Sequence, residues 1–171
     1  MNHSLKFLTV VFAAITSLSA HAHSGHAHHG HQHSQQGDFG DAAKASAPDG
    51  VTVSDCWIRA LPNRLPSAAY FTLNNSSAHD AALIGAQSKA FGKVMLHANT
   101  TVNGMAAMVH EDKVELPAGG SFEFAPGGHH VMLEQPASEL EIGKSLPITF
   151  WFEEGRAITS DCEIRSAAGL E

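Results

Sequence analysis

From residue 51 onward the chain consists of short runs rich in β-branched, aromatic and other apolar residues, separated by Gly, Pro and Asn. Many short runs at near-regular spacing, with no amphipathic helical pattern among them, are typical of antiparallel sandwiches and barrels. In residues 146–152 every second side chain, from Leu146 to Phe152, is apolar, so one face of that strand should lie in a core. We expect strands at residues 51–58, 68–73, 81–86, 93–97, 113–116, 121–125, 129–133, 146–152 and 157–164.

The first 22 residues have the layout of a secretory signal peptide. Lys6 precedes the apolar run 7–15, and small residues then end in Ala20-His21-Ala22. We expect cleavage after Ala22, with cleavage after Ala20 as the alternative. No apolar run approaches the roughly 20 residues that a membrane-spanning helix needs, and no Cys lies at the junction to carry a lipid. The sequence therefore predicts an exported, soluble protein that does not insert into the membrane after cleavage.

Composition divides the remaining chain into a tail and one domain. Residues 23–49 are rich in His, Gly, Ala, Asp and Ser and offer little to bury, which predicts a disordered tail and linker. Residues 50–167 are long enough for a single β domain with a modest core. Loss of the signal peptide, which contains one Lys and no acidic residue, changes the formal net charge from -7 to -8. A chain this acidic is a poor candidate for binding nucleic acid.

The chain has two cysteines, Cys56 in the first predicted strand and Cys162 in the last. Because disulfides persist in exported proteins, a bridge that ties the two ends of the domain together is the favoured interpretation. A metal-binding role for the pair is the alternative. It is disfavoured because neither cysteine has a second Cys or a His at ligand spacing beside it.

Methionine and histidine are concentrated in one stretch. Apart from the initiator, all methionines fall within the 38 positions 95–132, which also contain four histidines. His130 and Met132 are separated by one residue, and in a strand two such side chains point to the same face about 7 Å apart, whereas His129 should point to the opposite face. Thioethers are soft, uncharged ligands that favour Cu(I), while Zn(II) normally takes more imidazole, carboxylate or thiolate and Ca(II) takes oxygen. The pattern predicts an exchangeable Cu(I) site.

Other methionines and histidines of the domain have simpler interpretations. Met95 and Met105 lie in apolar or turn-adjacent settings, which favours packing over ligation. His79 and His110 have acidic neighbours, so we expect both to face solvent.

The spacing of four residues is specific. Ten residues separate His97 from Met108, and twenty-one separate Met108 from His130. With Met132 and the segment PGGHHVML, this spacing resembles the motif of the periplasmic copper chaperones for the CuA centre, the PCuAC family. The resemblance extends over about residues 51–165 and includes the segments DCWIRALPN, AAYFTLNN, LIGAQS, LPAGG and FWFEEG. The chain departs from the pattern at Ala98, where many relatives carry a Met close behind the first His, and in its pair of cysteines.

The resemblance implies a cupredoxin-like antiparallel β-sandwich of Greek-key topology. It also implies a Cu(I) site formed by His97, Met108, His130 and Met132. The implied function is that of a periplasmic metallochaperone, not an enzyme, that delivers Cu(I) to the CuA site of cytochrome c oxidase subunit II or a related copper enzyme, alone or alongside a Sco-type thiol protein. A periplasmic buffering or resistance protein for copper or zinc is the alternative.

The tail offers a second group of metal ligands. Its first eleven residues contain six histidines: His23, His26, His28, His29, His31 and His33. Imidazoles in such a segment can bind Cu(II) or Zn(II) at neutral pH, and they should release metal below about pH 6 because the ligand must be neutral. The alternative is a solvated linker whose histidines bind metal only adventitiously.

Two other classes of copper protein fit the sequence poorly. An electron-transfer cupredoxin needs a Cys ligand near its C-terminal His and Met, but no His or Met follows Cys162. An oxidase or dismutase needs several histidines around a stable redox centre, and the only His-dense stretch is the tail. Carriage and buffering of copper are therefore the two leading hypotheses.

Overall fold

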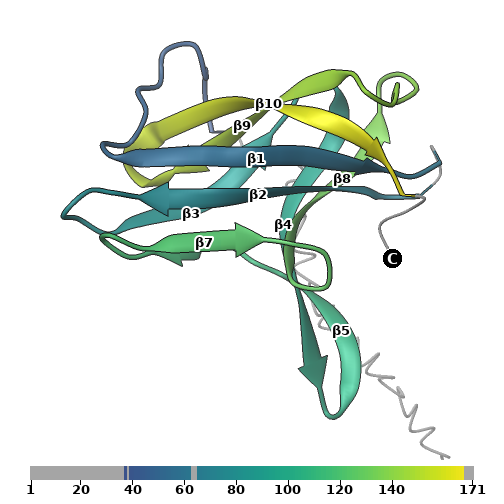
Figure 1. The fold of residues 1–171 in the computed structure, drawn as a ribbon, viewed down its shortest axis with the longest axis horizontal. Helices are drawn as coiled ribbons and strands as arrows, with labels where there is room; N and C mark the ends of the chain where they lie inside the picture. Colours follow the sequence, from purple (N-terminus) through teal and green to yellow (C-terminus); the bar gives the residue numbers. More distant parts are fainter. Residues whose placement is uncertain (1–36, 38, 63–64, 168–171) are drawn as a thin grey trace, which may run out of the picture. The chain divides into compact units, whose positions relative to one another are not determined.

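The computed structural model describes residues 37, 39–62 and 65–167 (Figure 1). The predicted signal peptide and the six tail histidines lie outside the described residues. The described part contains ten strands and one short 3-10 helix: β1 (Val51–Ala60), β2 (Ser67–Asn75), β3 (Ala81–Gln87), β4 (Phe91–Val102), β5 (Met105–His110), β6 (Val114–Leu116), β7 (Ser121–Phe124), β8 (His129–Pro136), β9 (Ser145–Phe152), η1 (Glu153–Gly155) and β10 (Arg156–Ser166).

The strands form one hydrogen-bonded series that folds over itself into a sandwich (Figure 1). Its order is β5-β4-β8-β2-β1-β10-β9-β3-β6, and β7 pairs with β2. Neighbouring strands are antiparallel except β1 and β10, which run parallel with Trp57 beside Glu163. Each of the nine predicted strands coincides with an observed one, so the all-β prediction is confirmed.

The inward faces of the strands enclose one apolar core. Phe71 lies at its centre, with ring centroids 4.3 Å from Phe124 and 4.2 Å from Phe150. On β9 the alternating residues Ile148, Phe150 and Phe152 are all buried, as the period-2 pattern predicted. This core fixes which face of each strand turns outward, and therefore where the outward-facing polar and sulfur side chains gather.

The end of the expected linker packs against the sandwich. The Phe39 ring stacks on Trp151 with centroids 5.8 Å apart, covering a side chain that points away from the core. Gly85 permits this contact, because any side chain there would collide with the Phe39 ring. The backbone amide of Ala157 also donates to the Ser46 carbonyl oxygen at 3.0 Å. Residues 39–49 therefore differ from the disordered linker that their composition predicted, since one aromatic residue within a polar segment is enough to anchor it.

Cys56 and Cys162 form the predicted disulfide. The two cysteines are 106 positions apart in sequence, and the parallel pairing of β1 with β10 brings them side by side. A bulge in β1 accompanies the bridge, where Asp55 adopts a φ of 54° and the register with β2 shifts. The bridge therefore ties the first strand of the domain to the last.

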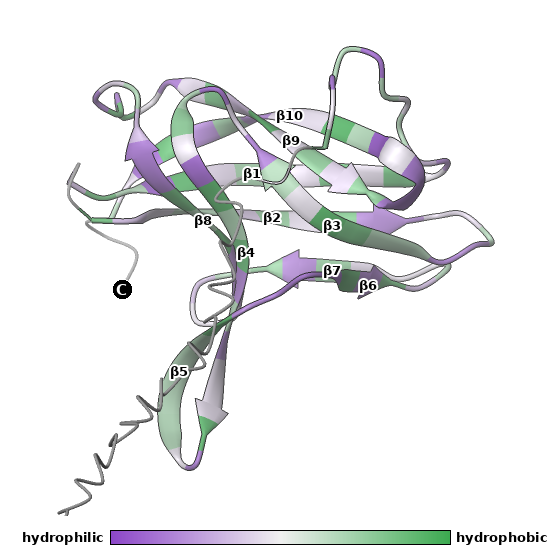
Figure 2. Ribbon diagram, turned by 180° about the vertical axis from the view of Figure 1, so that it is seen from behind, coloured by the Kyte–Doolittle hydropathy of each residue, from purple (hydrophilic) through white to green (hydrophobic). Residues whose placement is uncertain are grey.

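The β4–β5 hairpin was not predicted as such. β4 extends five residues beyond the expected end at residue 97, turns through Asn103-Gly104 with both φ angles positive, and returns as β5. The hairpin projects from the sandwich (Figure 1), and Figure 2 shows apolar colouring along β5. Its residues Val102, Met105 and Met108 are among the large apolar side chains exposed to solvent.

Candidate metal centre

Three adjacent strands, β5, β4 and β8, carry the four predicted copper ligands. His97 on β4 lies directly opposite His130 on β8, and its neighbours Leu96 and Val131 are buried in the core. Because side chains alternate along a strand, His97 and His130 point outward on the same face. Their ring centroids are 5.8 Å apart.

The two methionines lie on either side of this histidine row. Met132 is two residues beyond His130 on β8, one row along the face. Met108 is paired with Asn99, one row along in the other direction, and its Sδ lies 2.9 Å from Nδ1 of His97. Diagonal positions of this kind are within reach of long side chains. The fold therefore brings all four predicted ligands to one face of the sheet.

The four side chains form a gradient of exposure. His130 is buried, with 6% of its surface exposed, whereas Met108 on the projecting hairpin is 51% exposed. His97 and Met132 lie between these extremes. An ion held here would be anchored on the sandwich side and open to a second molecule on the hairpin side.

His130 is oriented by the backbone. Its Nδ1 lies 3.2 Å from the carbonyl oxygen of Gly128. A carbonyl oxygen only accepts hydrogen bonds, so this contact places the ring proton on Nδ1 and leaves the Nε2 lone pair for a metal. The PGGHH segment thus supplies both a predicted ligand and the group that orients it.

Both histidines are held toward the neutral form. Burial, followed by the nearby His130 and His110, lowers the pKa of His97. Burial also lowers the pKa of His130, and the positive charge of Arg59 contributes, whereas the hydrogen bond that His130 donates to the Gly128 carbonyl oxygen raises it. Since only neutral imidazole binds a metal, both shifts reduce competition from protons.

The chemistry of the donors defines which ions fit. Among the described residues, no three His, Cys, Asp or Glu side chains come close enough together to hold a metal ion. An ion on this face would therefore depend on the thioethers of Met108 and Met132. Two imidazoles with two thioethers suit a soft monovalent ion such as Cu(I), and they offer no oxygen ligand to Ca(II) or Mg(II).

An aromatic and cationic wall borders His130 on the side of β2 and β1. The Tyr70 ring is 6.5 Å from the His130 ring, and Trp57 packs on Tyr70 at 4.7 Å. The Arg59 guanidinium lies 5.6 Å from the Tyr70 centroid, and Arg165 lies 5.3 Å from the centroid of Trp57. Sequence reasoning did not assign these residues to the site. The DCWIRALPN segment contains two of them, but only the strand order shows that they face the ligands.

The remaining Met and His residues of this region have mixed outcomes. His129 points away from the ligands and packs edge-on against Phe122 at 4.9 Å, which confirms its predicted orientation. Met105 is 69% exposed, because the hairpin extends beyond the core, so the packing role that was favoured over ligation does not bury it. Met95 is half-buried and lies opposite Met132.

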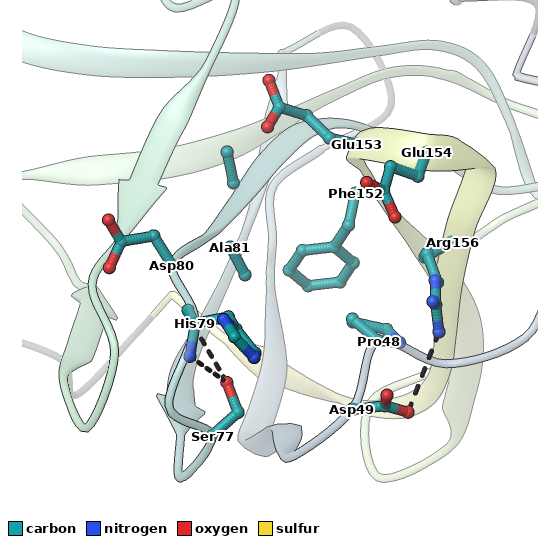
Figure 3. A pocket seen from close by; sticks show the side chains of 11 residues that line it. Pro48, Asp49, Ser77, His79, Asp80, Ala81, Phe152, Glu153, Glu154 and Arg156 are labelled. Carbon is teal, nitrogen blue, oxygen red and sulfur yellow. Dashed lines mark hydrogen bonds and ion pairs between the residues drawn. The ribbon is translucent and has the colours of Figure 1, made fainter.

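Two histidines were expected to face solvent, and both are exposed. His110 also shares the ligand face: its ring lies 5.8 Å from that of His97, and its Nε2 is 3.2 Å from a carboxylate oxygen of Asp112. His79 instead lines a separate cavity of about 330 Å³ near η1, together with Asp49, Asp80 and Arg156 (Figure 3). None of the four predicted copper ligands lines that cavity.

The described residues contain no helix long and apolar enough to cross a membrane.

Comparison with known proteins identifies the family to which the domain is similar. The family described as "Putative lipoprotein LpqE-like" matches residues 51–164. A protein of Leifsonia xyli subsp. xyli, named "Putative lipoprotein Lxx21020", is 34% identical over 108 residues, which are 63% of this chain and 64% of that protein. The chain thus matches less than two thirds of that relative's length.

Two solved structures share the fold. The copper-bound PCuAC domain from PmoF2 is 26% identical with a TM-score of 0.58, over 70% of this chain and 96% of that domain. The solution structure of CuI-DR1885 from Deinococcus radiodurans is 28% identical with a TM-score of 0.57, over 74% of this chain and 85% of that chain. The predicted cupredoxin-like β-sandwich is therefore confirmed.

Proposed function

The chain belongs to the LpqE-like family, and from this premise we propose that it is an exported Cu(I) carrier whose site consists of His97, Met108, His130 and Met132. The observation that carries the proposal is the convergence of these residues on one outward face. The two histidines lie opposite each other, and one methionine lies a row away on each side. Both solved structures described above carry copper in their names, and one of them names Cu(I).

Several features favour carriage over catalysis or electron transfer. Both cysteines of the chain are bonded to each other, so no thiolate is left for a blue-copper centre. Met108 is half-exposed on a hairpin that projects from the sandwich, which gives an incoming ligand direct access to the ion. His130 keeps the ion anchored until exchange is complete. A site with one accessible and one buried end suits transfer between proteins.

The destination of the copper is part of the proposal. We propose delivery to the CuA site of cytochrome c oxidase subunit II or a related copper enzyme, alone or alongside a Sco-type thiol protein. The signal-like N-terminus supports export to the periplasm as part of this proposal. The six tail histidines favour a second role, the buffering of Cu(II) or Zn(II), which would use ligands outside the described residues.

Replacement of both thioethers tests the site. We expect the full chain to bind one Cu(I) at the folded site under reducing conditions, and Met108→Leu with Met132→Leu to abolish this binding, because leucine keeps the volume and removes the sulfur. The measurement is a competition titration with a Cu(I) chelator, with all six tail histidines replaced by Gln in every protein. Circular dichroism should be unchanged.

Met105→Leu is the matched control, since Met105 lies on the same hairpin but points to the other face. Its Cu(I) affinity should equal that of the parent. Full Cu(I) affinity in the Met108 and Met132 double variant would refute the proposed site.

A further inference from the structure

Arg59 stands out among the charged groups on the ligand face. The register places Arg59 of β1 opposite Ala68 of β2, and Ala68 opposite Met132 of β8. These residues therefore form one transverse row. The Arg59 guanidinium lies over the ring of Tyr70, which in turn lies beside His130.

The charge of Arg59 has no counter-ion among the described residues. The Lys93 ammonium lies 3.2 Å from Glu134, and Arg165 lies 2.8 Å from Glu163, so both of these neighbouring cations are compensated. Arg59 instead rests on the Tyr70 ring, and its Nε is buried without a hydrogen-bond partner. A guanidinium keeps its charge at every physiological pH. The site therefore has one permanent, unneutralised positive charge beside it.

We propose that Arg59 sets the charge selectivity of the site, favouring monovalent Cu(I) over divalent ions. Repulsion between a fixed cation and a bound ion doubles when the ion changes from one positive charge to two. Arg59 lies two strands away from the ligand strand β8. In the intermediate dielectric of a protein surface, a unit charge at that separation changes the affinity for an ion on the order of tenfold. Arg59 should therefore disfavour Cu(II) about tenfold more than Cu(I). This inference rests on the proposed copper site.

Arg59 acts here through its positive charge and not as a metal ligand. A guanidinium cannot donate a lone pair to a metal. Its stacking on Tyr70 holds it in place, while Tyr70 itself lies against His130. The selectivity should consequently follow the charge and be retained by any residue that keeps a cation in this position.

Arg59→Gln tests the inference in the full chain with the six tail histidines replaced by Gln. Cu(I) affinity is measured against a Cu(I) chelator and Cu(II) affinity against glycine. We expect both affinities to rise and the Cu(II)-to-Cu(I) affinity ratio to rise about tenfold, which corresponds to a fall of about 59 mV in the reduction potential of the bound ion. Arg59→Lys should retain the parent ratio.

Arg165→Gln is the matched control, since Arg165 also stacks on a ring of the wall but is paired with Glu163. It should change the affinity ratio less than twofold. If Arg59→Gln lowers Cu(I) affinity or leaves the ratio unchanged, the inference is wrong, and Arg59 has only a packing role.

The Cu(I) measurement alone decides the matter if Cu(II) binding is too weak to quantify. Loss of a repelling cation raises Cu(I) affinity, whereas loss of packing lowers it. A parent protein that binds no Cu(I) would refute the proposed function instead.

Discussion

His130 combines three properties at the scale of a single residue. It is buried, its Nδ1 is committed to the Gly128 carbonyl oxygen, and its neighbour Arg59 opposes a second positive charge. Burial and the charge of Arg59 favour the neutral imidazole, and the hydrogen bond to the Gly128 carbonyl oxygen leaves Nε2 available. The residue is therefore prepared for a metal before the metal arrives, which limits the reorganisation that binding requires.

The lowered pKa values of His97 and His130 predict a dependence of stability on pH. Both folded-state values lie below the ordinary 6.5. As the pH falls below 6.5, the unfolded chain therefore takes up protons that the folded protein does not. Their stabilising contribution is complete above the unfolded pKa and is lost as the pH falls through the folded pKa.

Urea unfolding of the copper-free protein between pH 7.5 and 5, taken as a practical range around the ordinary histidine pKa, checks this prediction. Replacement of His97 and His130 by Gln should make the decline in unfolding free energy shallower. An equally steep decline in this variant would show that other groups cause it.

The spacing of His97, Met108, His130 and Met132, through its resemblance to the PCuAC motif, predicted four residues that the strand register does place on one face. A period-2 strand puts His130 and Met132 together without any knowledge of the neighbours. The role of Arg59 could not be predicted in this way. It depends on the order β1-β2-β8 and on the lack of an ion-pair partner for Arg59 among the described residues, and neither is a local property of the sequence.

At the scale of elements, the β4–β5 hairpin is the part of the fold that was not predicted from the sequence. Residues 105–110 read MAAMVH, in which alanine weakens the strand pattern, and only Asn103-Gly104 signals a hairpin turn. The hairpin is nevertheless essential to the proposed site, because it alone carries Met108. Its outer strand β5 ends the series of paired strands. An exposed strand edge beside a metal ligand can also meet a partner protein.

The contact between Phe39 and Trp151 predicts a stability effect far from the metal face. Phe39→Ala should lower the free energy of unfolding by about 1–2 kcal/mol, because it removes a partly buried ring and its stacking contact. Gly85→Val should have a similar effect, since a side chain there displaces the same ring. Urea unfolding measures both.

The double variant separates this explanation from two independent defects. If both changes act by releasing Phe39, the double variant should be as stable as the less stable of the two single variants. Additive losses would contradict the explanation. Cu(I) affinity should be unchanged in all three proteins.

At the scale of the whole domain, the disulfide joins the first strand to the last. A bridge that closes a loop of about 100 residues reduces the entropy of the unfolded chain by an amount equivalent to about 4–5 kcal/mol. Replacement of Cys56 and Cys162 by Ala should therefore lower the free energy of unfolding by several kcal/mol, measured by urea unfolding. A loss below about 1 kcal/mol would show that the strand pairing alone closes the domain.

The proposed function gives the chain two metal-binding regions of different character. The folded face offers two imidazoles and two thioethers, whereas the tail offers imidazoles alone. The first suits Cu(I), and the second suits Cu(II) or Zn(II). Metal binding by the folded domain therefore has to be measured with the tail histidines replaced, so that metal bound to the tail does not contribute to the signal.

X-ray absorption at the copper K edge tests the central claim most directly, with the Cu(I)-loaded full chain carrying Gln at the six tail histidines. We predict an edge typical of Cu(I) and a first shell of two sulfur and two imidazole nitrogen ligands, which becomes one sulfur in Met108→Leu. A first shell of nitrogen and oxygen only, or one unchanged by Met108→Leu, would contradict the proposed site.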